Sequence, residues 1–186
     1  MNRKPNNSLG AGVWAGDRGK RITLAILKKM GARKVQTLLH GDGHPGNVFH
    51  QAATDRFTWI DFQLTHVGPP GFELSQGLPL GLNGADRAMF ERVVAAYYAA
   101  FIAAAPAGTA EQYTAAECWE DFLFGIYLWG LAITPLMIPL LRKACSLPED
   151  DPGLAGLRAA FPRSYLCNHI LGIEQFVADF AQAEGI

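Results

Sequence analysis

Residues 40–47 of the chain read His40-Gly41-Asp42-Gly43-His44-Pro45-Gly46-Asn47, and a second polar group, Asp61-Phe62-Gln63, follows after a short interval. Apolar runs precede both groups: Val35 to Leu39 before the first, and Phe57 to Ile60 before the second. Short apolar runs separated by Gly, Pro, Asn and Asp are typical of strands joined by turns. The sequence therefore predicts that both polar groups lie at strand ends, where reactive side chains can gather.

The residues between the two polar groups predict a β-hairpin. Residues 48–50 form an outgoing strand, residues 51–56 are polar enough to reverse the chain, and residues 57–62 return. A hairpin of this length brings Asn47 and Asp61 to the same end, with Asp42 just upstream. Carboxylate and amide oxygens suit Mg²⁺ that carries the phosphates of a nucleotide. Asp42 then remains available to orient a hydroxyl group.

Two other interpretations of residues 40–47 stay open at this point. The stretch is rich in Gly, Pro, Asp and Asn, so it suits a simple turn, although a turn does not explain Asp61 at the end of an apolar strand. Alternatively, His40, Asp42 and His44 alternate like metal ligands on one face of a strand, as in a metal-dependent hydrolase. Glycine and proline between these residues argue against a regular strand there.

The order of these residues resembles the arrangement in protein kinases, where Asn follows the Asp of a His-x-Asp loop and a strand-borne Asp-Phe-x comes next. The loop is closer to the His-Gly-Asp-x-His-x-x-Asn of aminoglycoside phosphotransferase and choline kinase-like small-molecule kinases. Ile60-Asp61-Phe62-Gln63 looks like the ecdysteroid kinase-like branch of that superfamily. The resemblance covers about Arg21 to the C-terminus and thins after Leu80. It implies ATP and Mg²⁺ as cofactors and a small-molecule hydroxyl as substrate.

The resemblance also implies roles for individual residues. Asp42 is the expected catalytic carboxylate, and Asn47 and Asp61 are the expected metal and cofactor ligands. His44 is expected to reach the transferred phosphoryl group, and His40 to support the loop from below. Related kinases often have Asp-Leu-Ala after the metal strand, with an Asp that ties down the catalytic loop. Here Glu73 takes that position, and it either braces the loop or simply lies in the first turn of the next helix.

Length, composition and charge set limits on the class of protein. The chain has 186 residues, of which 49% are hydrophobic and 18% charged, which suits one folded domain with a sizeable core. The formal net charge is -1, so no nucleic-acid-binding surface is indicated. The three cysteines, Cys118, Cys145 and Cys167, are widely spaced and predict neither a disulfide framework nor a zinc site. A cytoplasmic location is the simplest expectation.

The N-terminal region predicts a flexible leader over residues 1–20, followed by a kinase-like C-terminal lobe over residues 21–186. Gly10, Gly12 and Gly16 do not form a phosphate-binding loop, because no strand precedes them and no Gly-Lys-Ser/Thr follows. Twenty residues are too few for the N-terminal lobe of a complete kinase. We therefore expect weak nucleotide binding and doubtful activity alone, and self-association through the surface left by the missing lobe.

Helical patterns fill the remaining sequence. A short helix is predicted over Arg21 to Met30, a longer one over Asn83 to Ala105 with Asn83 as its cap, and a final helix over Pro162 to Ala183. Residues 64–74 are predicted to be a loop because of Gly68-Pro69-Pro70-Gly71. A further helix begins near Thr114, which forms a capping box with Glu117.

Residues 122–141 carry no charge over a length that would span a membrane, but two prolines and two glycines favour a buried helix in a folded lobe. Residues 148–156 predict a solvated acidic loop.

These patterns predict an α+β fold that is mostly helical, a protein kinase-like C-terminal lobe with a small β-hairpin carrying the catalytic loop. The predicted function is ATP-dependent phosphoryl transfer to a small-molecule hydroxyl. The main rival is a non-catalytic lone lobe that binds nucleotide and metal without turnover, and a metal-dependent hydrolase is the other.

Overall fold

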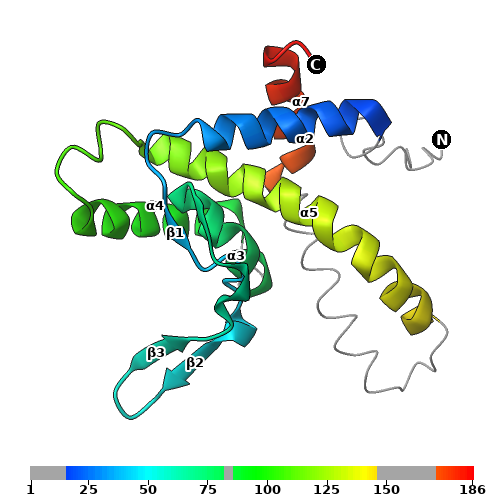
Figure 1. Ribbon diagram of the computed structural model, residues 1–186. Helices are drawn as coiled ribbons and strands as arrows, with labels where there is room; N and C mark the ends of the chain where they lie inside the picture. Colours follow the sequence, from blue (N-terminus) through cyan, green and yellow to red (C-terminus); the bar gives the residue numbers. More distant parts are fainter. Residues whose placement is uncertain (1–15, 82–85, 146–170) are drawn as a thin grey trace.

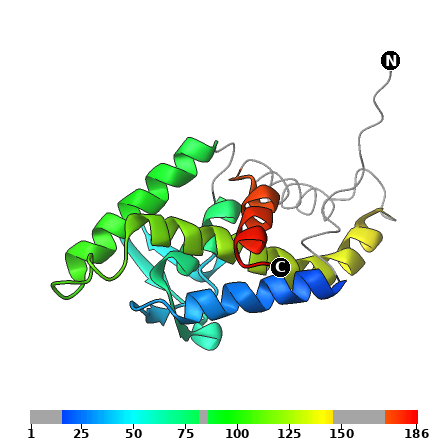
Figure 2. The same cartoon turned by 90° about the horizontal axis from the view of Figure 1, so that it is seen from above.

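The chain is described by a computed structural model over residues 16–81, 86–145 and 171–186. Helix α5 (Ala115–Cys145) runs through the centre of the molecule, with α2 (Gly16–Gly31) along one side and α4 (Arg87–Ala104) on another (Figure 1). Helix α7 (Ile173–Ala183) lies against α5 next to α2, as the view from above shows (Figure 2). The fold is therefore mostly helical, as the sequence predicts. Among the described residues, no helix combines the length and apolar character that a membrane crossing requires.

The core forms where the apolar faces of these helices meet. On α2, Ile22, Ile26 and Met30 recur every four residues and are buried, which places one stripe of the helix against the core. Their partners come from α4, α5 and α7 and include large aromatic side chains. The fully buried members with the greatest volume are Tyr113, Tyr127, Phe90, Phe122 and Phe124. Packing of this face, more than intrinsic helix propensity, therefore stabilises the helices.

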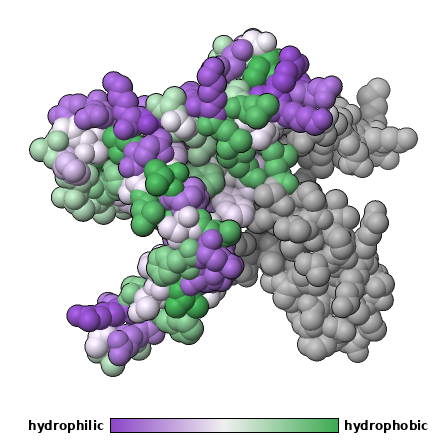
Figure 3. Space-filling view, in the orientation of Figure 1, coloured by the Kyte–Doolittle hydropathy of each residue, from purple (hydrophilic) through white to green (hydrophobic). Residues whose placement is uncertain are grey.

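The predicted hairpin is confirmed. Strand β2 (Val48–Gln51) pairs antiparallel with β3 (Arg56–Trp59), with Val48 opposite Trp59 and Gln51 opposite Arg56. It projects away from the helices, so its side chains are mostly exposed (Figure 1). Apolar and polar side chains lie interspersed along it (Figure 3). Such a hairpin gains little from burial, and its stability depends on the loop at its base.

A second small sheet supports that base. Strand β1 (Thr37–Leu39) pairs antiparallel with β4 (His66–Gly68), with Leu39 opposite His66. The prediction of a loop over residues 64–74 is therefore wrong in part, because residues 66–68 form a strand. Two short 3₁₀ turns, η2 (Phe62–Leu64) and η3 (Pro70–Glu73), flank this strand. Pairing β1 with β4 brings the residue before His40 close to the residues that follow Asp61-Phe62-Gln63.

Helix α3 (Leu74–Gly81) packs between η1 (Pro45–Asn47), in the loop of residues 40–47, and α5. Two glycines allow this close packing: a Cβ on Gly77 would overlap the carbonyl oxygen of Gly43, and a Cβ on Gly71 would overlap that of Cys118. Only a residue without a side chain lets backbones approach so closely. The loop containing residues 40–47, preceded by β1, therefore rests directly on α3.

Helix boundaries differ from the sequence predictions in three places. Helix α2 begins at Gly16, so residues 16–20 are helical and not part of a loose leader. Helix α4 is capped by Asp86, whose side chain accepts from Met89 N at 2.8 Å, whereas the predicted cap Asn83 lies outside the described residues. The final helix, α7, begins at Ile173 with Gly172 (φ of 64°) as its N-cap residue, whereas residues 162–170 of the predicted helix lie outside the described residues. Residues 1–15 and the predicted acidic loop 148–156 also lie outside the described residues.

The capping box at the start of α5 is confirmed. Thr114 N donates to Glu117 Oε2 at 2.8 Å, and Glu117 N donates to Thr114 Oγ1 at 3.2 Å. Each side chain thus satisfies the other's free backbone donor. These hydrogen bonds lower the pKa of Glu117 despite the opposing effect of desolvation, which is the largest single influence on it.

Candidate active site

The carboxylate of Asp42 is held by one side-chain donor on each oxygen. Gln76 Nε2 donates to Oδ1 at 2.5 Å, and Asn47 Nδ2 donates to Oδ2 at 3.0 Å. Asn47 Nδ2 also donates to the Asp42 carbonyl oxygen at 3.0 Å. The Asp42 side chain is still 16% exposed, so another molecule can reach it. A carboxylate with a fixed orientation and an accessible edge is suited to holding a hydroxyl group.

His40 links the loop to the end of the hairpin. Asp42 N donates to His40 Nδ1 at 3.3 Å, and His40 Nε2 lies 2.8 Å from the Ile60 carbonyl oxygen. The neutral ring with its proton on Nε2 satisfies both contacts. The ring also packs near Trp59 and Phe62, with centroids 5.2 and 4.6 Å away. Both ring nitrogens are engaged with backbone groups, which leaves neither for a metal ion.

Glu73 contacts the start of the same loop. Its Oε2 accepts from His40 N at 2.7 Å and lies 3.5 Å from Gly41 N. Gly41 has φ of 79°, a left-handed conformation that favours glycine, and the backbone of Leu64 approaches where a Cβ would stand. Glu73 thus ties η3 to the residue that follows β1. Glu73 is the last residue of η3 and precedes α3, whose first turn contains no acidic residue, so its contacts fit the bracing alternative.

His44 caps the short 3₁₀ turn η1 (Pro45–Asn47). Its Nδ1 accepts from Gly46 N at 3.0 Å, and its Nε2 lies 3.7 Å from Asp42 Oδ1. The side chain is 32% exposed beside the Asp42 carboxylate. Its contact with a phosphoryl group remains a prediction.

Asn47 and Asp61 carry the oxygens expected to hold a metal ion. Ile60 N donates to the Asn47 carbonyl oxygen at 3.0 Å, which joins the loop to the strand that leads to Asp61. Asn47 is buried and uses its amide nitrogen on Asp42, so Oδ1 is the side-chain atom that could contact a metal ion. Asp61 is exposed and has φ of 65°. Such strained backbone is concentrated at functional sites.

These two residues fit a magnesium ion by their chemistry. Amide and carboxylate oxygens are hard ligands, and a site with few protein ligands leaves room for water and phosphate oxygens, as Mg²⁺ prefers. In the described part of the chain, no three His, Cys, Asp or Glu residues gather as a metal-binding group. The zinc-type set of His40, Asp42 and His44 therefore receives no support from the geometry.

Sequence reasoning missed Gln76. The signal was present, because Gln76 follows Glu73 by three residues and so shares its face at the start of a helix. Helix α3 is short and contains Gly77 and Pro79, and this composition obscured the helical pattern.

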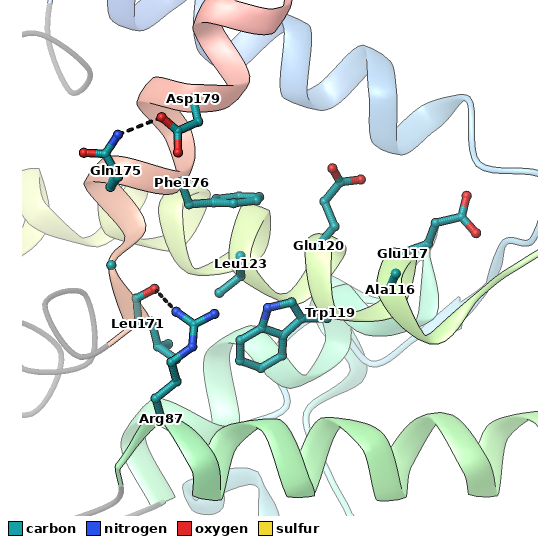
Figure 4. A pocket seen from close by; sticks show the side chains of 11 residues that line it. Arg87, Ala116, Glu117, Trp119, Glu120, Leu123, Leu171, Gln175, Phe176 and Asp179 are labelled. Atoms are coloured by element: carbon teal, nitrogen blue, oxygen red, sulfur yellow. Dashed lines mark hydrogen bonds between the residues drawn. The ribbon is translucent and has the colours of Figure 1, made fainter.

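A separate hollow lies between α4, α5 and α7, away from these residues (Figure 4). Its polar side chains already have partners. Arg87 donates to the Leu171 carbonyl oxygen at 3.1 Å and to Glu91 Oε1 at 2.8 Å, and Gln175 donates to Asp179 at 2.7 Å. None of the predicted site residues lines it.

The loop, the hairpin and the carboxylates define a chain consistent with the small-molecule kinase-like superfamily. The chain belongs to the ecdysteroid-kinase-like family DUF1679, described as "uncharacterized oxidoreductase dhs-27", which matches residues 20–152. It is also 37% identical over 81 residues to methylthioribose kinase from Geobacillus kaustophilus (strain HTA426). That match covers 43% of this chain and 20% of the kinase, so the chain spans about a fifth of this relative. No solved structure matches the chain significantly.

Proposed function

We propose that this chain is a protein kinase-like C-terminal lobe that takes part in ATP-dependent phosphoryl transfer to the hydroxyl of a small molecule. The observation that carries the proposal is the Asp42 carboxylate, oriented on both oxygens and accessible at one edge. The similarity to methylthioribose kinase supports the reaction class and suggests a sugar-like acceptor. Cytoplasmic location belongs to the same proposal.

In the proposed reaction, Asp42 accepts a hydrogen bond from the acceptor hydroxyl and aligns its oxygen with the γ-phosphorus of ATP. A new oxygen–phosphorus bond forms while the bond from the γ-phosphorus to the β,γ-bridging oxygen breaks, and ADP leaves. The hydroxyl proton passes late to Asp42. Asn47 and Asp61 would hold Mg²⁺, which neutralises phosphate charge when bound. His40 and Glu73 keep the loop in place throughout.

The word oxidoreductase belongs to the description of the family. The described geometry of this chain does not support a dinucleotide-dependent oxidoreductase. Dinucleotide-binding folds are built from parallel strands joined by helices. In residues 16–81, 86–145 and 171–186, both sheets consist of two antiparallel strands. Phosphoryl transfer therefore fits the described site better.

The test combines a turnover assay with calorimetry of Mg²⁺-ATP binding, using methylthioribose, sugar, aminoglycoside and choline-like acceptors. Asp42→Asn should lower kcat by about 10² or more with little change in nucleotide affinity, because it removes the proton acceptor and keeps the side chain's size. The matched control is Asp179→Asn, because Asp179 also accepts a hydrogen bond from a glutamine but is exposed on α7. Turnover of Asp42→Asn within a few-fold of the wild type would contradict the assignment.

A second pair of variants tests the metal ligand. Asp61→Ala should abolish Mg²⁺-dependent nucleotide binding, because it removes a charged ligand. Asp55→Ala is its control, since Asp55 is another exposed aspartate with positive φ, at the hairpin turn. Binding that depends on Asp61 without turnover of any acceptor would favour the rival function, a non-catalytic nucleotide-binding lobe.

A further inference from the structure

Gln76 lies on α3 and is buried, with 9% of its surface exposed. The proposed reaction gives no role to this side chain. Its amide nitrogen donates to Asp42 Oδ1 at 2.5 Å. Its amide oxygen is buried and has no hydrogen-bond partner among the described residues. The orientation of this amide follows from chemistry, since rotating it by half a turn would place its oxygen against a carboxylate oxygen.

An unpartnered buried oxygen makes glutamine an unfavourable choice for packing alone. Burying a polar atom without a partner destabilises a fold, and an apolar side chain of similar shape avoids that penalty. The amide oxygen of Gln76 therefore destabilises the fold, while its amide nitrogen contacts the Asp42 carboxylate. Polar groups kept at such a cost are concentrated at functional sites.

The contact restricts a torsion that is otherwise soft. Rotation of an aspartate carboxylate about its last side-chain bond has broad minima. Two donors from different elements, Asn47 at the end of η1 and Gln76 on α3, fix both oxygens of Asp42. Glu73, three residues before Gln76, holds the first part of the loop. Gly77, one residue after it, lets α3 approach the Gly43 backbone.

We propose that Gln76 is a positioning residue, which fixes the rotation of the Asp42 carboxylate and so sets the direction in which the acceptor hydroxyl is held. This inference rests on the proposed phosphotransferase function. Gln76 does not touch the reacting atoms, and it acts through Asp42 alone.

The first arm of the test is kinetic. Gln76→Leu should lower kcat about ten- to a hundredfold, because a misdirected catalytic group costs rate even when binding is intact. Its KM for nucleotide should stay unchanged, and its melting temperature should equal or exceed that of the wild type, since the orphan oxygen is gone. Gln175→Leu is the matched control, because it removes an exposed glutamine–aspartate hydrogen bond on α7 (Figure 4) and should leave kcat unchanged.

A conservative variant supplies a pH signature that a purely structural role would not give. Glu at position 76 donates to Asp42 only while protonated, and two adjacent carboxylates retain a shared proton. The kcat of Gln76→Glu should therefore recover toward low pH and fall as pH rises, whereas Gln76→Leu should lose activity at every pH. Turnover of Gln76→Leu within twofold of the wild type, or a Gln76→Glu profile parallel to the wild type, would overturn the inference.

The second arm needs no turnover and separates this inference from the proposed function. The side-chain amide resonance of Gln76, assigned by its loss in Gln76→Leu, should shift in Asp42→Ala, while that of Gln175 should not. A Gln76 resonance that does not respond to Asp42→Ala would overturn the positioning contact. A resonance that responds would support the contact, whereas nucleotide binding that does not depend on Mg²⁺ or on Asp61 would contradict the phosphotransferase proposal separately.

Discussion

Carboxylates occupy two contrasting regions of this molecule. In the helical region, Asp121 is fully buried and accepts from Arg33 Nε at 3.0 Å, beside Glu117 and Glu120 on the same helix. In the loop and hairpin, Asp42 is partly accessible and Asp61 is exposed. The helical carboxylates join distant segments of the chain through Arg33, whereas among the described residues Asp42 and Asp61 have no cationic partner of this kind and can be reached by another molecule. The same chemical group thus stabilises the fold in one place and offers chemistry in the other.

A chain of hydrogen bonds connects the two regions. Tyr113 OH donates to Asp121 Oδ2 at 3.0 Å and accepts from Gly71 N at 3.0 Å. Gly71 lies in η3, the turn that ends with Glu73, and Glu73 holds the backbone of His40. The buried ionic cluster therefore contributes to the placement of the loop. Burial, together with nearby Asp121, raises the pKa of Tyr113 strongly, so the phenol remains a donor.

Removing the cation of the buried cluster should have the largest effect on stability. The Arg33 side chain is 8% exposed and pairs with three carboxylates, so Arg33→Ala leaves Asp121 buried without its charged partner. We expect a loss of about 3–5 kcal/mol in the free energy of unfolding, measured by urea denaturation. Lys20→Ala, which breaks an exposed ion pair with Asp17, is the control and should change little. Equal losses in the two variants would contradict a stabilising role for the cluster.

The pH dependence of stability should also reveal the cluster. Burial raises the pKa of Asp121 to about 6, against the opposing effects of Arg33 and Tyr113. The pKa of Arg33 is raised as well, because attraction to Asp121 and Glu120 outweighs the effect of burial. An unfolded aspartate has a pKa of about 3.9, so the folded state binds the proton more tightly.

This difference in proton affinity fixes the sign of the effect. The stabilising contribution of Asp121 is fully present below about pH 4 and is lost as pH rises through about 6. Asp121→Asn removes this titration while keeping the size of the side chain. The wild-type free energy of unfolding, minus that of Asp121→Asn, should therefore decline between pH 4 and 6 in urea titrations. A constant difference across that range would show that Asp121 does not titrate in this way.

Local patterns made the hairpin and the capping box predictable from sequence. The hairpin follows from apolar runs around a polar turn, and Thr114 with Glu117 follows from a spacing of three residues. Residues 64–74 concealed β4 because their glycines and prolines indicate a loop. Only the distant strand β1 gives residues 66–68 a partner.

The buried contacts were not predictable in this way. Arg33 lies in a short link between two elements, and its partners lie more than eighty residues further along the chain. Net charge and local spacing carry no information about that pairing. Gln76 likewise becomes informative only when the fold places it against Asp42. The sequence thus predicted the accessible carboxylates of the loop, whereas the groups that hold it in place depend on tertiary packing.

The smallest effect on stability should come from the hairpin, where apolar residues are exposed. Phe49 is 63% exposed and Phe57 is 64% exposed, on adjacent strands. Replacing both with threonine keeps good strand formers and removes little buried area, so the free energy of unfolding should change by less than about 1 kcal/mol. Phe122→Ala in the core is the contrast and should cost about 3–5 kcal/mol.

The same double variant tests the expected self-association. Exposed apolar patches promote association, so the wild type should form concentration-dependent oligomers in sedimentation velocity experiments, and Phe49→Thr with Phe57→Thr should shift the equilibrium toward monomer. A control with Leu24→Thr, which removes an exposed leucine on α2, separates a specific hairpin contact from general surface hydrophobicity. If both variants reduce association equally, the hairpin is not the contact surface. If the hairpin variant alone does so, the exposed strands that lead to Asp61 are the surface on which a second chain rests.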